Sequence, residues 1–244
     1  MSKNNLNLHV NNFTKVKKIL ENKSYGVEYQ PFISTKNGEI EGYEALARFT
    51  YKGIPFRPDN FFAICHENNQ LFFEAEYMIK QFQFINRPHN SKLFVNFDPH
   101  ILLNKENINP MFNLFSKQRN FVIELVENSS DAVNTPKLMD IFRSLNFNFA
   151  ADDFFKEDSK LSLALLKECD YLKLDIDTLK EMKNDRHFIN IVEGLVKYSH
   201  ALNKKVILEG VETSEDLALA KKIKIDYIQG FLFRSLFIKK MLHE

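Results

Sequence analysis

Short apolar segments alternate with amphipathic helical patterns along most of this chain, and this alternation constrains the fold more than any other feature. The apolar segments have the length of buried strands and span residues 27–34, 40–48, 92–97, 120–126, 147–153, 170–175, 205–210 and 225–229. Apolar residues at helical spacing lie between most of them, over 58–87, 132–145, 158–169, 184–203 and 214–222. Alternating strands and helices favour a parallel sheet with crossover helices, and eight such strands favour a (β/α)8 barrel of the TIM type.

The first two segments depart from the ideal barrel. Only residues 35–39 separate them, and these contain Asn37-Gly38, a dipeptide typical of a tight hairpin turn. We therefore expect an α/β fold, a modified (β/α)8 barrel whose first strand is antiparallel. We also expect one barrel domain over residues 14–244, preceded by a flexible, Asn-rich N-terminal segment over 1–13.

Composition excludes several classes of protein. A formal net charge of +1, from 33 basic and 32 acidic residues, gives no general attraction to DNA, RNA or an anionic membrane. No stretch approaches the roughly 18 apolar residues of a membrane span, and no apolar signal follows Met1. Cys65 and Cys169 are far apart in sequence and fit free thiols in a reducing compartment. We therefore expect a cytoplasmic protein with no membrane and no nucleic-acid partner.

Six of the apolar segments end in an acid, an amide or a lysine, a pattern typical of a metal site. These are Glu44, Asn96, Glu124, Glu127, Asp152, Asp153, Lys173, Asp175, Glu209 and Glu212. Because the active residues of a barrel lie at the C-terminal ends of its strands, we expect these groups to gather at one rim. Any one carboxylate alone is more often a helix cap or a solvated loop residue, but six such ends are hard to attribute to chance.

The chemistry of these groups indicates hard divalent cations. Oxygen ligands without Cys or His favour Mg²⁺, Mn²⁺ or Ca²⁺ over Zn²⁺. The adjacent pair Asp152-Asp153 suits two ions, which together activate water and stabilise displacement at phosphorus, and Lys173 could orient that water. The seven histidines show no HExxH or other metal spacing, and the seven glycines form no Walker loop or GxGxxG.

At these residues the chain resembles the EAL-domain family of cyclic di-GMP phosphodiesterases. Glu44-Ala45-Leu46 is the motif that names the family, and it continues to Arg48. The other matches, in chain order, are Tyr29-Gln30-Pro31, Asn96, Glu124-Leu125-Val126-Glu127, Asp152-Asp153-Phe154, Lys173-Leu174-Asp175, Glu209-Gly210-Val211-Glu212-Thr213 and Gln229-Gly230-Phe231. They cover about residues 27–233, nearly the whole chain.

The resemblance implies a role for each matched residue. One metal would be held by Glu44, Asn96, Glu124 and Asp152, and a second by Asp152, Asp153 and water. Lys173 would contact the attacking water, Glu209 would act on the metal–water network, and Glu127 would brace the loop after the fifth strand. Substrate contacts are implied for Gln30, Arg48, Asp175, Glu212 and Gln229.

The implied reaction is hydrolysis of cyclic di-GMP to linear pGpG with two Mg²⁺ or Mn²⁺ ions, inhibited by Ca²⁺. The family also implies a homodimer whose interface involves the loop after the fifth strand. No sensor domain is visible in the sequence, so regulation is expected to come from expression, from dimerisation or from a separate regulatory protein partner.

The loop after the fifth strand departs from the family pattern. The family reads Asp-Asp-Phe-Gly-Thr-Gly, whereas this chain has Phe155 and Glu157 in place of the two glycines, within the altered stretch Phe155–Lys160. Glycine permits a positive φ and close backbone approach, so a different loop path is expected. An alternative function therefore stays open: a weak or inactive EAL module that binds cyclic di-GMP as an effector or regulates another protein. A sugar hydrolase would also use paired carboxylates but gives the asparagine and lysine no role.

Overall fold

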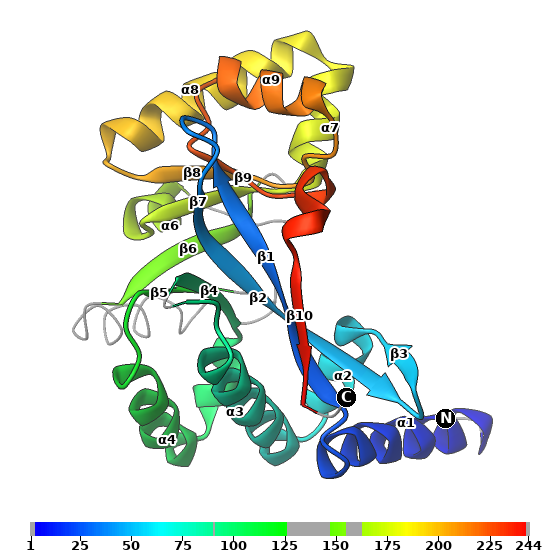
Figure 1. The fold of residues 1–244 in the computed structure, drawn as a ribbon. Helices are drawn as coiled ribbons and strands as arrows, with labels where there is room; N and C mark the ends of the chain where they lie inside the picture. The colour runs from blue at the N-terminus through cyan, green and yellow to red at the C-terminus, as the bar shows by residue number, and fades with distance from the viewer. Residues whose placement is uncertain (1–2, 90, 126–146, 155–162, 243–244) are drawn as a thin grey trace.

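The computed structural model describes residues 3–89, 91–125, 147–154 and 163–242, and its strands form a sheet that closes on itself (Figure 1). Around the barrel the order is β1-β9-β8-β7-β6-β5-β4-β2, and β2 pairs back onto β1. The bounds are β1 Tyr25–Ser34, β2 Ile40–Tyr51, β4 Lys92–Phe97, β5 Phe121–Leu125, β6 Asn148–Phe154, β7 Tyr171–Leu174, β8 Lys205–Leu208 and β9 Tyr227–Ile228. All eight predicted strands are present, and the predicted fold class is confirmed.

Strand β1 is antiparallel to both of its barrel neighbours, β2 and β9, whereas the other barrel pairs are parallel. The predicted hairpin turn joins β1 to β2, with Gly38 at a φ of 75° and the Asn37 side chain accepting from Glu39 N at 3.1 Å. Two short strands extend the sheet beyond the barrel: β3 (Ile54–Phe56) pairs with β2, and β10 (Ile238–Met241) pairs with β1. Neither was predicted, because three or four residues are too few to show an alternating pattern.

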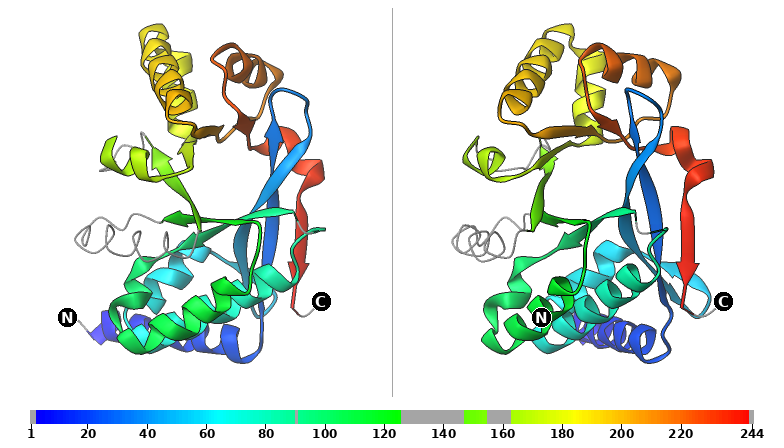
Figure 2. Two further views of the ribbon diagram at one scale, coloured as in Figure 1. Left: turned by 90° about the vertical axis from the view of Figure 1, so that its left-hand side faces the viewer. Right: turned by 60° about the vertical axis from the view of Figure 1, so that its left-hand side comes forward.

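The helices lie outside the barrel. They are α1 Lys3–Glu21, α2 Pro58–Cys65, α3 Asn69–Ile85, α4 Lys105–Ser116, α6 Leu163–Glu168, α7 Ile176–Asn184, α8 Arg186–Ala201 and α9 Ser214–Lys222, with short 3-10 turns η1 Pro99–Leu103 and η2 Phe231–Leu236. Figures 1 and 2 show α1 to α4 gathered at one side of the barrel and α7 to α9 at the other. In the described part of the chain, no helix is long and apolar enough to cross a membrane.

Several helix predictions can be compared with these bounds. The pattern over 58–87 divides into α2 and α3, because Asn68 accepts a hydrogen bond from Leu71 N at 2.9 Å and starts a new helix. Thr213 caps α9 as expected, in a capping box with Asp216. Residues 3–13 form the first part of α1, and the domain boundary at residue 14 stays a prediction. The helical pattern over 132–145 lies outside the described residues.

A layer of apolar side chains fills the barrel interior. Its members are Phe32, Phe94, Val122, Ala150, Tyr171 and Ile207, all buried, with Tyr227 packed against them. The Phe94 ring meets Phe32 and Tyr171 edge-on, at centroid distances of 4.5 and 4.9 Å. Since side chains two positions apart on a strand share a face, the residues that follow this layer toward the strand ends also face the interior. We call this layer the barrel floor.

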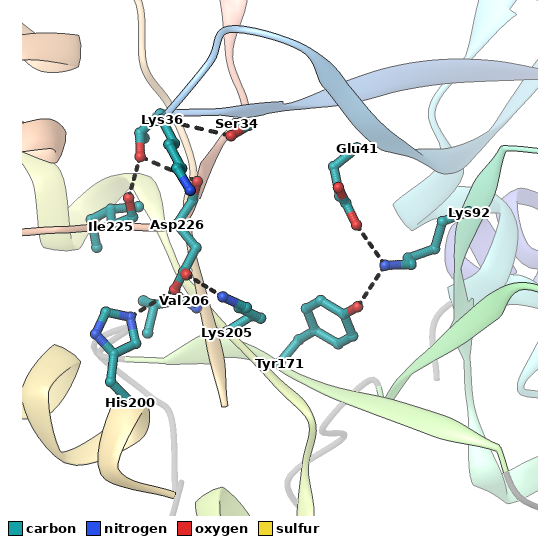
Figure 3. A network of polar contacts seen from close by, with 11 residues as sticks. Ser34, Lys36, Glu41, Lys92, Tyr171, His200, Lys205, Val206, Ile225 and Asp226 are labelled. Atoms are coloured by element: carbon teal, nitrogen blue, oxygen red, sulfur yellow. Dashed lines mark hydrogen bonds and ion pairs between the residues drawn. The ribbon is translucent and has the colours of Figure 1, made fainter. Parts of the chain in front are cut away.

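Polar groups close the opposite end, where the parallel strands begin. Lys92 at the start of β4 donates to Glu41 at 2.7 Å and to the Tyr171 hydroxyl at 2.9 Å, and Figure 3 shows it between the two. Asp226 accepts from Lys205 at 2.8 Å and contacts the His200 ring at the same distance, which ties α8 to the chain before β9. Polar groups at this end of a barrel serve stability more than chemistry.

Candidate active site

One buried lysine lies among four carboxylates at the C-terminal ends of the strands. Lys173 Nζ is 2.7 Å from Glu209 Oε1, 2.8 Å from Glu124 Oε1, 3.0 Å from Asp152 Oδ1 and 3.7 Å from Glu44 Oε2. The side chains of Lys173 and Glu124 are 1% and 0% exposed. The structure therefore brings together five residues from five different strands or strand ends.

Amide side chains hold Glu44 from both sides. Asn96 donates to Glu44 Oε1 at 3.0 Å, and Gln229 donates to Glu44 Oε2 at 2.9 Å. Gln229 also approaches Gln30 Oε1 at 3.5 Å. These three amides extend the cluster around β1, β2, β4 and the end of β9, so the predicted rim is continuous across the antiparallel strand.

Strand register explains this convergence. Asn96 and Glu124 are partners on the parallel pair β4–β5, and Gln30 and Glu44 are partners on the antiparallel pair β1–β2. Most members of the cluster lie two positions beyond a residue of the barrel floor, as Glu124 follows Val122. Gly210 ends this rim after Glu209 with a φ of 72°, packed against Ile176, where a side chain would be strained.

Burial and mutual charge shift the ionisation of the cluster. Burial raises the pKa of Glu124 well above its usual range, with repulsion from Glu44 adding to the effect. Burial also raises the pKa of Glu209 to about 8. Burial opposes ionisation of Glu44, but the Lys173 ammonium and the two amide donors outweigh it and lower the pKa of Glu44.

The pKa of Lys173 moves in the other direction from that of a lone buried lysine. Burial alone would lower it, but the carboxylates of Asp152, Glu124 and Glu209 outweigh burial and raise it well above the usual range. Lys173 is therefore charged at neutral pH. It faces more negative charge than it can neutralise if every carboxylate ionises.

The oxygen atoms available as metal ligands fit hard divalent cations. Glu124 Oε2 is buried and accepts from no donor among the described residues, so a carboxylate oxygen is available inside the cluster. Carboxylate and amide oxygens from Glu44, Asn96, Glu124 and Asp152 are the ligands that Mg²⁺ and Mn²⁺ prefer. A cation would also relieve the mutual repulsion that raises the pKa of Glu124.

Arg48 has a partner that the sequence did not reveal. Its guanidinium Nη2 lies 2.6 Å from Glu28 Oε1, and Gln30 donates to the same oxygen at 2.9 Å. Glu28 precedes Gln30 by two positions on β1, so both face the same side of the strand. This alternation was the available signal for Glu28, which the predicted substrate-binding set omitted.

Two predicted residues have other contacts in the structure. The Asp175 side chain caps α7 by accepting from Asp177 N at 2.8 Å. Glu212 is exposed, and its backbone N–H donates to Asp216 at 3.1 Å within the α9 cap. No contact of either side chain with the carboxylate cluster is seen in the described part, and their substrate roles stay predictions.

The remaining predicted features lie outside the described residues. Glu127 and the altered loop Phe155–Lys160 are among them, and so is the side chain of Asp153, although its backbone belongs to β6.

Known proteins with a similar sequence or fold were compared with this chain. It is 24% identical over 225 residues to "Probable cyclic di-GMP phosphodiesterase PdeB" of Escherichia coli. The matched region spans 88% of this chain but only 43% of the length of PdeB. An EAL domain protein of Listeria monocytogenes superposes with a TM-score of 0.72 at 27% identity, over 90% of this chain and 91% of that one. The YkuI protein of Bacillus subtilis, solved with cyclic di-GMP and calcium, superposes with a TM-score of 0.75 at 20% identity. The superposition covers 94% of this chain and 59% of the YkuI chain.

Fold and cluster together define a modified α/β barrel with an acidic site at the C-terminal ends of its strands. The chain belongs to the EAL domain family, whose model matches residues 14–235. The resemblance drawn from the motifs is confirmed.

Proposed function

We propose that this protein is a cyclic di-GMP-specific phosphodiesterase that hydrolyses one phosphodiester bond to give linear pGpG. The observation that supports it most is the group of carboxylates and amides that the described residues place around Lys173. The name of PdeB, and the cyclic di-GMP bound by YkuI, support the same substrate. In the reaction, water adds to phosphorus, one P–O bond to a ribose oxygen breaks, and that oxygen takes a proton.

The described side chains fit one divalent ion, and a second ion beside it is part of the proposal. Glu44, Asn96, Glu124 and Asp152 would hold one Mg²⁺ or Mn²⁺, and Asp152 with Asp153 and water would hold the other. When bound, such ions lower the pKa of water and stabilise charge on the phosphoryl oxygens. Ca²⁺ is proposed to inhibit, because its longer and more variable coordination distances fit a catalytic site poorly.

The protein's own side chains would then orient the reactants. Lys173 is charged and lies within 3.0 Å of three carboxylates, so it would donate to the attacking water once metal binding draws one of these carboxylates away. Glu209, with a pKa near 8 before any ion binds, suits proton transfer close to neutral pH. Gln30, Gln229 and Arg48 border the cluster and would contact substrate, Arg48 through a phosphate. Glu127 would brace the loop after β6.

The direct test is product formation. Purified protein incubated with cyclic di-GMP and Mn²⁺ should release pGpG, detected by chromatography. Glu44→Gln should lower the rate by more than about 100-fold, since even outer residues of metal sites contribute 10–100-fold. Glu41→Gln is the matched control, because Glu41 also pairs with a lysine but at the opposite end of the barrel. Turnover that survives Glu44→Gln would contradict the metal assignment.

The second candidate is an EAL module that binds cyclic di-GMP or another protein without turnover. Two observations favour it: Phe155 and Glu157 replace the family's glycines, and Glu28 occupies the Arg48 guanidinium. Calorimetry with cyclic di-GMP separates the cases, since binding without pGpG indicates an effector. Neither binding nor product would leave a role in protein interaction. A homodimer and a cytoplasmic location also stay proposals.

A further inference from the structure

Three side chains outside the active site converge on one point. His66 follows α2, while Asp98 and His100 lie at the start of η1, directly after β4. One potential ligand atom from each lies within 4.8 Å of the others. This group, here called the His–Asp–His triad, comes from two segments about thirty positions apart, so it could not be predicted from sequence spacing.

Both imidazoles direct a nitrogen at the same carboxylate. His66 Nε2 is 2.9 Å from Asp98 Oδ2, and His100 Nδ1 is 2.7 Å from Asp98 Oδ1. The two rings are nearly perpendicular, with an interplanar angle of 80° and centroids 5.6 Å apart. Their nitrogens therefore approach from different directions, as ligands around one ion do.

The surroundings hold the triad in place. The His66 ring packs on Phe72 at a centroid distance of 4.2 Å, and Asp98 accepts from His100 N at 2.9 Å as the cap of η1. Asp98 is buried, whereas His66 is 30% exposed, so the group can be reached from solvent on one side. The triad is therefore packed against the protein on one side and open to solvent on the other.

A purely structural role for the triad would be to cap η1 by hydrogen bonds. Capping explains the position of Asp98 but not why two imidazoles contact it. The η1 turn is already capped by the contact from His100 N to Asp98. That contact requires neither imidazole. Two histidines on one carboxylate give three ligands with an open position, the composition of many transition-metal sites.

Charge also favours a cation here. Glu76 and Lys80 form a buried ion pair of 2.9 Å on α3. Glu76 also interacts electrostatically with Asp98 and His66. The Asp98 carboxylate repels Glu76, while the Lys80 ammonium attracts it, so two buried carboxylates lie near one another beside the triad. A cation held by Asp98 would weaken the repulsion between them.

We propose that His66, Asp98 and His100 form a second metal site, specific for a transition metal of the Zn²⁺ class and separate from the carboxylate cluster. Zinc takes nitrogen and oxygen ligands at about 2.0–2.2 Å, which places neighbouring ligands about 3.3 Å apart in a tetrahedron. The two histidine–carboxylate contacts would widen by about half an ångström. A solvent molecule would complete the coordination.

Metal binding there would join two turns that the sequence keeps apart. Asp98 is two positions after Asn96, which borders the active site, and His66 ends the helix before α3. A bound ion would therefore fix the chain that follows Asn96. This inference concerns a different site and does not depend on the proposed phosphodiesterase activity.

The test is a titration of the whole protein with Zn²⁺ against a chromophoric chelator, and with Co²⁺ followed by its visible absorption. Wild-type protein should bind Zn²⁺, and the Co²⁺ spectrum should show the intense bands of a low-coordinate site with nitrogen ligands. His66→Ala and His100→Ala should each weaken this binding by about 100-fold or more and remove the bands. Asp98→Asn should weaken it too while keeping the cap, because asparagine also accepts from His100 N.

His200→Ala is the matched control. His200 also bonds a carboxylate, Asp226 Oδ2 at 2.8 Å, but has no second histidine beside it in the described structure. It should bind Zn²⁺ like the wild type, and any ion held by the carboxylate cluster is common to all variants. Equal affinity in wild type, His66→Ala and His100→Ala would overturn the proposal, as would equal losses in His200→Ala. Should Asp98→Asn fail to fold, the half-buried His66 still decides the outcome.

Discussion

A single ammonium group holds the carboxylates of the candidate site together. Lys173 contacts acids from β5, β6 and the end of β8, and without it these buried or partly buried carboxylates would repel one another uncompensated. Because each acid lies on a different strand, no pair of neighbours in sequence reveals the arrangement. Its members were predictable as a set, since each ends an apolar segment, but the central place of Lys173 depends on the closed barrel.

Glu28 is the residue whose effect the sequence did not indicate. Burial opposes its ionisation, but hydrogen bonds from Arg48 and Gln30 outweigh burial and lower its pKa, so Glu28 is charged at neutral pH. A substrate phosphate would have to compete with this carboxylate for Arg48. If the proposed substrate is right, Glu28→Gln should lower the Kd for cyclic di-GMP by roughly ten-fold, the worth of about one charge-assisted hydrogen bond.

Calorimetry with the nucleotide measures this change. Glu41→Gln removes a carboxylate from a lysine pair at the far end of the barrel and should leave the Kd as it is. Unchanged or weaker binding in Glu28→Gln would mean that Glu28 positions Arg48 for substrate and does not compete with it.

At the scale of elements, the cap of α9 shows how local sequence fixes a helix start. Thr213 accepts from Asp216 N at 3.2 Å, and Asp216 accepts from Thr213 N at 3.1 Å. Thr213→Ala should lower the free energy of unfolding by about 1 kcal/mol, because a helix donor loses its partner.

Urea unfolding provides the measurement for this cap. Ser214→Ala is the control, since the Ser214 hydroxyl contacts only the exposed Glu215 in the described structure and should change stability by less than half as much. Equal effects of the two substitutions would show that the capping contact is energetically silent.

Elements with local signals were predictable, and those defined by distant contacts were not. Thr213, the Asn37-Gly38 turn and the eight barrel strands all carry short-range patterns. Strand β10 exists because Ile238–Met241 reach back to Gly26–Tyr29, more than two hundred positions away. The break between α2 and α3 depends on one capping residue, Asn68, inside an otherwise helical pattern.

For the whole molecule, the proposed metal binding by the carboxylate cluster would link folding to divalent ions. A ligand that binds only the native state adds stability by mass action, about 2.7 kcal/mol at a concentration near 100 times its Kd. Saturating Mg²⁺ should therefore raise the urea midpoint of the wild type, and a chelator should reverse the gain. Asp152→Asn should lose most of this response.

The Mg²⁺ response of Glu41→Gln should match that of the wild type, because this pair lies at the other end of the barrel. A gain of the same size in Asp152→Asn would place the stabilising ions elsewhere.

The barrel floor has a consequence for how ligands reach and leave the candidate site. Among the described residues, its six side chains fill the barrel interior between the acids and the Lys92–Glu41 ion pair at the other end. Ions, water and nucleotide would then reach the acids from the side of the C-terminal strand ends. Bound product would block the binding of the next substrate molecule, and the rate of product release would set an upper limit on the turnover rate.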